Sequence, residues 1–159
     1  MNIYLIRHSD AEKSSENIKD NDRKLTPEGE QKAKICALGW KNIIKGFDFI
    51  VSSPLARAIQ TAKIISEVFE HKKDIVIDKR ITCGTKTEDL IELANSLGGE
   101  EMAFVGHEPD FSEHVSRLVS ISGAFVEFKK CAIAKISFQN KARIGKGILE
   151  FLIPPKAYK

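Results

Sequence analysis

Asn2-Ile-Tyr-Leu-Ile6, followed at once by Arg7-His8-Ser9-Asp10, is the stretch of this 159-residue chain that decides the fold. A short β-rich run that stops at a polar group indicates a strand that ends in a loop. Similar runs without polar alternation recur at residues 47–51, 75–77 and 102–105. Such runs are typical of central strands that are covered on both faces, as in α/β sheets.

Helical patterns lie between these runs. Thr26-Pro-Glu28 combines an N-cap, a first-turn proline and an early acid, and apolar residues follow at helical spacing as far as Ile44. Ser53-Pro54 predicts the opening of a second helix, and Thr87 predicts the cap of a third. A fourth helix is predicted to start at Asp110, in a variant of the capping box.

The chain ends in two further β-rich runs, at residues 132–138 and 147–153, separated by a charged stretch that contains glycine. They predict a hairpin that adds an antiparallel edge to the sheet. Because strands and helices alternate elsewhere, the predicted fold class is α/β, a three-layer α/β/α sandwich with a mostly parallel central sheet. The length predicts a single domain over residues 1–159, with a functional loop at residues 10–24.

The composition is that of a globular protein, with 42% hydrophobic and 30% charged residues. The net charge of +3 comes without a basic stripe, so no nucleic-acid partner is expected. No run of hydrophobic residues exceeds four, and no signal peptide is apparent, which predicts neither membrane association nor secretion. An odd number of scattered cysteines, Cys36, Cys83 and Cys131, predicts buried reduced thiols and a cytoplasmic location.

Polar residues follow three of the predicted strands. Arg7 and His8 follow the first, Arg57 stands just beyond the second, and His107 follows the fourth. Because ligands of open α/β sheets gather beyond the carboxyl ends of the strands, these side chains are expected at one edge. Guanidinium groups suit phosphate, and a neutral imidazole is a competent nucleophile toward phosphorus.

The same residues have ordinary explanations when each is taken alone. A single histidine after a strand is commonly a hydrogen-bonded structural residue, and a single arginine is commonly solvated or paired. His71 and His114 lie in or after helical patterns and are expected to be structural. Neither metal-ligand spacing nor a glycine-rich Walker loop is present, so we expect no metal, no cofactor and no nucleotide-driven transfer.

Four sequence blocks carry a resemblance to a known family. Leu5-Ile-Arg-His-Ser9 resembles the Arg-His-Gly signature of the histidine phosphatase superfamily, the phosphoglycerate mutase-like group. Later blocks of that family are matched in order by residues 25–29, 52–61 and 105–107. The short length resembles the SixA-type phosphohistidine phosphatases in particular, which implies a phosphoglycerate mutase-like fold.

The resemblance implies a role for each matched residue. His8 is similar to the nucleophile that becomes phosphorylated, and Arg7, Arg57 and His107 are similar to the residues that bind the phosphoryl oxygens. Arg23 resembles a further phosphate-contacting arginine of SixA-like members. Two positions depart from the pattern. Ser9 replaces the usual glycine beside the nucleophile, and Lys24 replaces a proline, which would leave Arg23 less rigidly held.

The acid that protonates a leaving group is harder to find. In mutase-like members a carboxylic acid follows the third strand, whereas here Glu88 and Asp89 come late and suit a helix start. Asp10 and Glu12 are the remaining candidates. An alkoxide leaving group needs such an acid, but a phosphorylated imidazole can leave without one.

The leading hypothesis is therefore a metal-independent phosphatase that hydrolyses phosphohistidine on a protein through a covalent phosphohistidine intermediate. His8 would attack phosphorus in line, the cationic groups would stabilise the oxygens, and water would release phosphate. Residues 78–101 leave little material for a lid, which favours a protein-borne substrate. The alternatives are a phosphomonoesterase for a small metabolite or sugar phosphate, and a non-catalytic phosphate-binding module, which would not need His8 beside Arg7.

Overall fold

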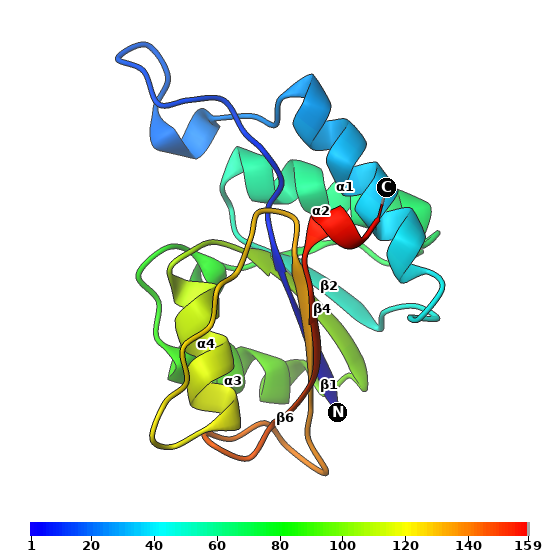
Figure 1. Cartoon of the computed structure of the whole chain (residues 1–159), viewed down its shortest axis with the longest axis vertical. Helices are drawn as coiled ribbons and strands as arrows, with labels where there is room; N and C mark the ends of the chain where they lie inside the picture. Colours follow the sequence, from blue (N-terminus) through cyan, green and yellow to red (C-terminus); the bar gives the residue numbers. More distant parts are fainter. Residues whose placement is uncertain (159) are drawn as a thin grey trace.

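A computed structural model describes residues 1–158 and shows one six-stranded sheet with helices on both faces (Figure 1). The strand order is β3-β2-β4-β1-β5-β6. The strands and helices, in chain order, are β1 (Asn2–Arg7), α1 (Pro27–Trp40), β2 (Phe49–Ser52), α2 (Ala56–Val68), β3 (Val76–Ile77), α3 (Thr87–Leu97), β4 (Glu101–Gly106), α4 (Asp110–Val119), β5 (Ile133–Ser137) and β6 (Ile148–Ile153).

The sheet is mostly parallel with an antiparallel edge, as the sequence predicts. Strand β4 pairs in parallel with β1 and β2, and β2 pairs in parallel with β3. The hairpin of β5 and β6 joins the other side of β1 in antiparallel fashion. Parallel strands end at the same edge, so the residues after β1, β2 and β4 all emerge at the upper end in Figure 1.

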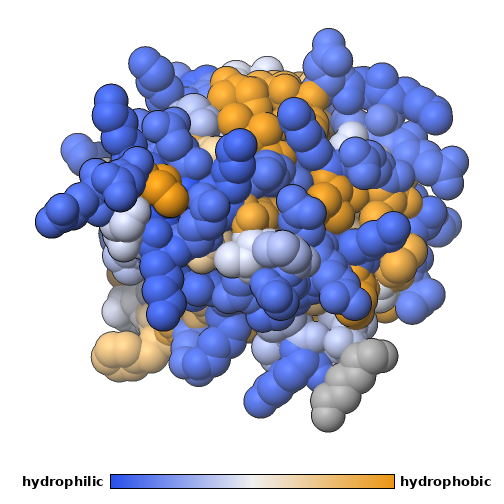
Figure 2. Space-filling view, turned by 90° about the horizontal axis from the view of Figure 1, so that it is seen from above, coloured by the Kyte–Doolittle hydropathy of each residue, from blue (hydrophilic) through white to orange (hydrophobic). Residues whose placement is uncertain are grey.

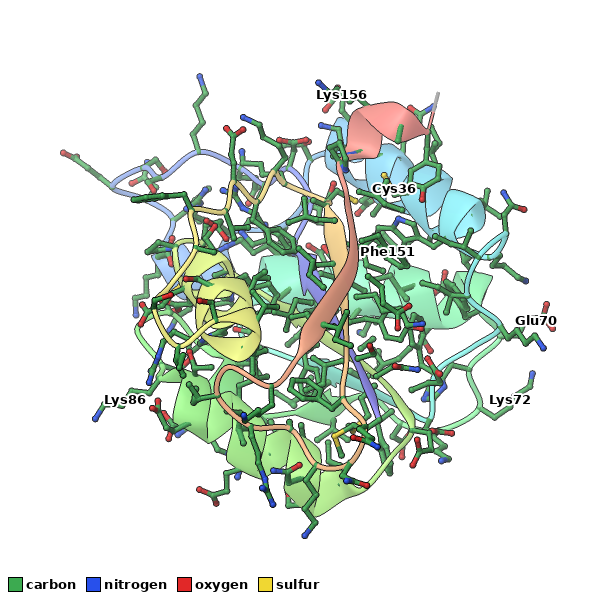
Figure 3. All side chains as sticks on the ribbon, turned by 60° about the horizontal axis from the view of Figure 1, so that its bottom comes forward. Cys36, Glu70, Lys72, Lys86, Phe151 and Lys156 are labelled. Atoms are coloured by element: carbon green, nitrogen blue, oxygen red, sulfur yellow. The ribbon has the colours of Figure 1, made fainter. Side chains whose placement is uncertain are left out.

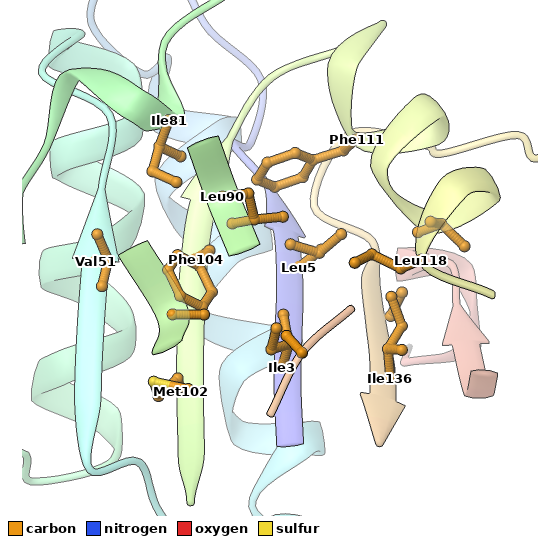
Figure 4. Packing of buried hydrophobic residues seen from close by; sticks show 14 of the residues in the cluster. Ile3, Leu5, Val51, Ile81, Leu90, Met102, Phe104, Phe111, Leu118 and Ile136 are labelled. Atoms are coloured by element: carbon orange, nitrogen blue, oxygen red, sulfur yellow. The ribbon is translucent and has the colours of Figure 1, made fainter. Parts of the chain in front are cut away.

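Two hydrophobic cores, one on each face, hold the layers together. Along β1, Ile3 and Leu5 point into the core formed with α3 and α4, while Tyr4 and Ile6 point into the core formed with α1 and α2. This alternation follows from the two-residue period of a strand, and both faces are apolar because both are covered. Figure 4 shows the first core, where Leu5 packs with Leu90 and Phe111. Each such buried side chain contributes about 1.5–3 kcal/mol.

The start of α1 is as predicted. The Thr26 side chain accepts a hydrogen bond from the amide of Gly29 at 3.0 Å, and Pro27 is the first helical residue. The first turn of α1 also packs against the chain that leaves β1, because a Cβ on Gly29 would lie only 2.0 Å from the Asp10 carbonyl oxygen. The amide of Thr26 donates to that same oxygen at 3.0 Å. This contact anchors the beginning of the loop 10–24.

Helix α4 starts at Asp110 as predicted, but the start of α2 and the capping roles of Thr87 and Asp110 differ from the prediction. Helix α2 begins at Ala56, and the Ser53 hydroxyl accepts from the amide of Leu55 at 3.3 Å in the preceding turn. Thr87 and Asp110 are the first residues of their helices rather than caps, because their buried side chains bond to other segments. Thr87 Oγ1 contacts His114 Nδ1 at 2.9 Å, and Asp110 Oδ2 accepts from the amide of Gly84 at 2.7 Å.

The cysteines are all free, but they are not all buried. Cys36 and Cys131 are buried in the same core, although they are 95 residues apart in the sequence. The expectation of burial is wrong for Cys83, which is exposed in the turn between the 3-10 helix Lys79–Ile81 and α3. Within residues 1–158, none of the helices is both long and apolar enough to cross a membrane.

Candidate active site

The sheet-like backbone hydrogen bonding continues for one residue beyond the ends of β1 and β2, and it fixes the positions of the candidate residues. The amide of His8 donates to the Gly106 carbonyl at 3.0 Å, and the amide of Ser53 donates to the Val105 carbonyl at 3.0 Å. The segments after β1, β2 and β4 therefore stay side by side beyond the sheet. Figure 2 views this end of the molecule, where the surface is mainly hydrophilic.

His8 is buried, and its two ring nitrogens have different partners. Nδ1 lies 2.7 Å from the Ser9 carbonyl oxygen, so it carries the proton and donates. Arg57 Nε donates to His8 Nε2 at 3.3 Å, so Nε2 presents its lone pair to the cationic side of the pocket. Burial, opposed by the Ser9 carbonyl and reinforced by Arg57 and Arg7, lowers the pKa of His8 to about 4. The ring is therefore neutral and nucleophilic at pH 7.

Arg57 is held from two sides. Its Nη1 donates to the Asp20 carbonyl oxygen at 2.7 Å, and its Nη2 lies 3.1 Å from Asp20 Oδ2. On the helix side, Thr61 Oγ1 donates to the Arg57 carbonyl at 2.8 Å and accepts from the amide of Ser9 at 3.2 Å. Helix α2 is thus tied directly to Ser9, the residue after His8.

Arg7 faces the same pocket from β1. Its Nη1 donates to the Phe128 carbonyl at 2.7 Å, while its Nε is buried without a hydrogen-bond partner among the described residues. Burial lowers the pKa of Arg7, and the charges of Glu108 and Asp10 oppose that shift. The guanidinium remains a cation, because the ordinary pKa of arginine lies far above neutrality.

His107 lies against His8, with 5.1 Å between the ring centroids. Its Nε2 is 2.7 Å from Ser53 Oγ, whereas its buried Nδ1 has no partner within residues 1–158. Burial, reinforced by His8 and Arg57, lowers the pKa of His107 to about 3. This second neutral imidazole can give a hydrogen bond to a phosphoryl oxygen without repelling His8 by charge.

Arg23 joins this group through a shared carboxylate. It donates from Nη1 to Asp20 Oδ1 at 2.8 Å, so Asp20 bridges Arg23 and Arg57. Its Nε donates to the Glu12 carbonyl at 2.7 Å. Lys24 in place of proline adds a bond to this loop, because the Lys24 amide donates to Glu12 Oε2 at 2.9 Å and proline has no amide hydrogen to donate.

Ser9 also fits where a glycine was expected. Among the non-glycine residues of the described chain, only Glu70 and Cys131 have a positive φ. Ser9 therefore needs none of the conformational freedom that glycine would supply.

Basic side chains pair with three of the acidic residues, Asp10, Asp20 and Glu88. Burial raises the pKa of Asp10, but bonds to Lys32 and Lys130 outweigh it and lower the pKa overall. The Arg23 guanidinium, with a smaller contribution from Arg57, lowers the pKa of Asp20. Glu88 and Asp89 lie at the start of α3, where Glu88 pairs with Arg117 and Asp89 accepts from the Lys86 amide.

The described part of the chain has no group of three or more histidine, cysteine or acidic residues placed to hold a metal ion. Charge in the pocket is instead supplied by arginine. Guanidinium forks match the oxygens of a tetrahedral phosphoryl group and give charge-assisted hydrogen bonds to them. The arrangement can therefore bind a phosphoryl group and place a neutral imidazole nitrogen beside it.

The structure brings together the residues that the sequence singled out and adds three that it missed. Thr61 stands one helical turn after Arg57 inside a quoted block, so its spacing could have revealed it. Asp20 lies in a loop without periodicity, and the Phe128 contact uses a backbone carbonyl that any residue provides. No sequence signal points to those two.

Comparison with known proteins agrees with this geometry. Residues 3–82 match the sequence model of the histidine phosphatase superfamily (branch 1), and the chain belongs to that superfamily. An uncharacterized protein of Picosynechococcus sp. PCC 7002 is 29% identical over 136 residues, covering 84% of this chain and 82% of that protein.

Solved structures share the fold over nearly the whole chain. The protein histidine phosphatase SixA complexed with tungstate has a TM-score of 0.85 at 21% identity, covering 99% of both chains. A phosphoserine phosphatase of Entamoeba histolytica in complex with phosphoserine has a TM-score of 0.74 at 18% identity, covering 98% of both chains. The predicted phosphoglycerate mutase-like fold is confirmed.

The buried histidines make the stability of the protein depend on pH. Burial lowers the pKa of His114 to about 4, close to that of His8, and His107 is lower still. The unfolded chain takes up protons near pH 6.5, so it binds more protons than the folded chain between pH 6.5 and about 4. The free energy of unfolding should therefore fall as pH is lowered through this window, by about 1.4 kcal/mol per unit for each histidine.

Urea unfolding between pH 7 and pH 5 measures this effect before most carboxylates titrate. The unfolding midpoint should decrease steadily, and His114→Asn should reduce the slope by about one third, since it removes one of three such groups. A midpoint that stays constant from pH 6.5 to pH 5 would show that these rings are protonated in the folded protein.

Proposed function

We propose that the protein is a phosphatase that removes the phosphoryl group from a phosphohistidine on another protein, with His8 as the covalent nucleophile. The observation that carries the proposal is the ionisation of Asp10 and Asp20, two carboxyl groups that bond to basic side chains close to His8 and Arg57. Asp10 and Asp20 are both paired with basic side chains that lower their pKa values, so both are deprotonated at pH 7. A leaving group that requires a strong proton donor is poorly served by such a site.

The reaction follows from the tautomer of His8. Its Nε2 forms a bond to phosphorus while the bond from phosphorus to the substrate imidazole breaks, and that imidazole leaves neutral if its ring was protonated beforehand. The proton on Nδ1 stays hydrogen-bonded to the Ser9 carbonyl, which stabilises the positive charge that develops on the ring. Water then forms a bond to phosphorus while the bond from phosphorus to Nε2 breaks. The electron pair returns to Nε2, the protons of the water leave with the phosphate, and His8 regains its neutral form.

The cationic groups act on the phosphoryl oxygens. Arg57 already contacts His8 Nε2 through its Nε, so its guanidinium lies next to any group bound to that nitrogen. Arg7 and His107 complete the pocket, and Arg23 acts from the far side of Asp20. Because this environment exists before substrate binds, little reorganisation is needed when charge shifts in the transition state.

Similarity supports the phosphohistidine assignment without deciding it. The fold is similar to that of SixA, named as a protein histidine phosphatase, and also to that of a phosphoserine phosphatase. The segment between β3 and β4 holds only the 3-10 helix Lys79–Ile81 and α3, so little chain is left to enclose a small substrate. A site with so little covering chain favours a phosphorylated side chain on the surface of another protein as substrate.

Steady-state kinetics on matched substrates test the proposal. The kcat/KM for a phosphohistidine-containing phosphotransfer domain should exceed that for a sugar phosphate by about 10²-fold or more. A general acid typically contributes about this factor, and only the sugar phosphate needs one. Aryl phosphates should be weak surrogates, because a phenolate leaves more readily than an alkoxide. Equal or higher kcat/KM for the sugar phosphate would identify the protein as a small-molecule phosphomonoesterase.

Activity should not require a divalent metal. Arginine and histidine side chains supply the charge stabilisation that magnesium supplies in other phosphoryl-transfer sites. Turnover measured after exhaustive chelation should remain within about twofold of the untreated rate. A loss that magnesium, manganese or zinc restores would contradict this and would make Asp10 and Glu12 candidate ligands.

A further inference from the structure

A basic groove of about 510 Å³ includes Arg7 in its lining and so adjoins the candidate site. We call it the lysine groove and define it by Lys32, Lys129, Lys130 and Lys156, which line it together with Glu127 and the apolar residues Leu152, Pro154 and Pro155. It joins the segment before β5, the first turns of α1 and the chain after β6. In Figure 3, Lys156 lies at the upper end of the molecule, within the 3-10 helix Pro155–Ala157 that follows β6.

The residues in and around the lysine groove carry a net positive charge. Arg7 and the four lysines are accompanied by two carboxylates, Glu127 and Asp10, which leaves a local charge of +3. That equals the net charge of the entire chain, so the rest of the surface is neutral on balance. Lys156 is exposed and has no carboxylate within salt-bridge distance among residues 1–158.

The groove is held in a fixed position relative to the nucleophile. On one side of Lys129 and Lys130, the Phe128 carbonyl accepts from Arg7 Nη1 at 2.7 Å. On the other side, the amide of Cys131 donates to the carbonyls of Arg7 and His8 at 3.1 and 3.2 Å. Two lysines therefore stand between two anchor points on the Arg7–His8 dipeptide.

The kind of cation present indicates the kind of ligand. The Lys129 and Lys130 side chains are 58% and 44% exposed, and neither is a guanidinium fork or a buried donor. Solvated lysines of this kind hold a small anion weakly, because they lose hydration and side-chain freedom for little gain. Solvated lysines do attract and orient a large surface of opposite charge, because the weak electrostatic attractions of many charge pairs add up while the two proteins approach.

We propose that the lysine groove docks an acidic surface of the phosphohistidine-bearing protein, next to the phosphorylated histidine. This inference rests on the proposed function and adds the recognition element. Carboxylates that flank the phosphohistidine on a partner helix would lie over Lys129 and Lys156 while the phosphoryl group enters the pocket between Arg7 and Arg57. The apolar floor accepts the aliphatic stems of the partner's side chains.

Charge reversal tests the proposal directly. The probe is an acidic phosphotransfer domain phosphorylated on histidine, compared with para-nitrophenyl phosphate, which is too small to span the groove. The double variant Lys129→Glu/Lys156→Glu should lower kcat/KM for the domain by about 10–100-fold through KM and should flatten its salt dependence. Activity on para-nitrophenyl phosphate should change by less than about twofold.

Two further variants serve as controls. Lys72→Glu makes the same charge change on an exposed lysine away from Lys156, as Figure 3 shows, and should leave both activities unchanged. Glu127→Gln removes the carboxylate that pairs with Lys129 and should raise kcat/KM for the domain by about two- to fivefold.

The outcomes separate this inference from the function on which it rests. If the wild type prefers the domain but the double variant loses nothing, docking by the lysine groove is wrong and the proposed function stands. If the double variant loses activity equally on both substrates, the lysines serve the phosphoryl pocket and the inference fails. A wild type that does not prefer the domain would overturn the proposed function itself.

Discussion

His8→Ala is expected to lose about 10³-fold or more in kcat and to form no phosphoenzyme. The variant removes the Nε2 lone pair that faces Arg57, and no other nitrogen in the pocket has an equivalent position. His107 is placed differently, because its Nε2 contacts Ser53 Oγ rather than the Arg57 guanidinium. Losses of this size are usual when a covalent nucleophile is removed from an otherwise intact site.

Turnover and acid-labile labelling measure the effect, and circular dichroism confirms that the variant is folded. His71→Ala is the matched control, since His71 lies after α2 and outside the site, and it should retain full activity. Residual activity of one tenth or more in His8→Ala would show that His8 does not carry the phosphoryl group.

Arg57→Ala should reduce kcat/KM by about 10²–10³-fold and should weaken inhibition by tungstate or vanadate. The change removes a guanidinium that lies 3.3 Å from the nucleophilic nitrogen and leaves the Asp20 carboxylate facing the pocket with only Arg23 as partner. Both effects disfavour an anion in the pocket. Arg80→Ala, which removes an arginine that pairs with Asp78 and Glu92 and with none of the site residues, should leave kcat/KM and inhibition unchanged.

Arg57→Ala should also shift the acidic limb of the pH–activity profile to higher pH. Burial is the main cause of the low pKa of His8, and the Arg57 charge adds to it. Because His8 acts in its neutral form, activity falls when pH drops below its pKa of about 4. Removing Arg57 raises that pKa, so the acidic limb should move to higher pH.

Arg23→Ala, which acts through Asp20, should lower kcat/KM by only about tenfold.

The sheet and the core of the site could be predicted because their signals are local. The run Ile3–Ile6 is apolar on both faces, and Arg7 and His8 follow it, so the strand and the proposed nucleophile are specified together. Arg57 and His107 could be placed beside it because parallel strands must end at one edge. Those inferences needed only periodicity and topology.

Contacts between distant segments could not be predicted in this way. Asp20 reaches Arg57 from a loop that lacks hydrophobic periodicity, so nothing in its neighbourhood marks it. Thr87 and Asp110 resemble helix caps in the sequence, yet burial gives them partners in other segments, His114 and Gly84. Such positions are decided by packing after the elements form, and local propensity is then overridden.

The most direct test of the account is rapid-quench transfer of a labelled phosphoryl group from the histidine of a phosphotransfer domain to the wild-type protein. We expect the label to appear on His8, acid-labile and stable to alkali, before inorganic phosphate is released. Peptide mapping would locate the label at residues 7–9. Release of phosphate from the domain with no label on His8, or labelling of His8 by a sugar phosphate but not by the domain, would contradict the account.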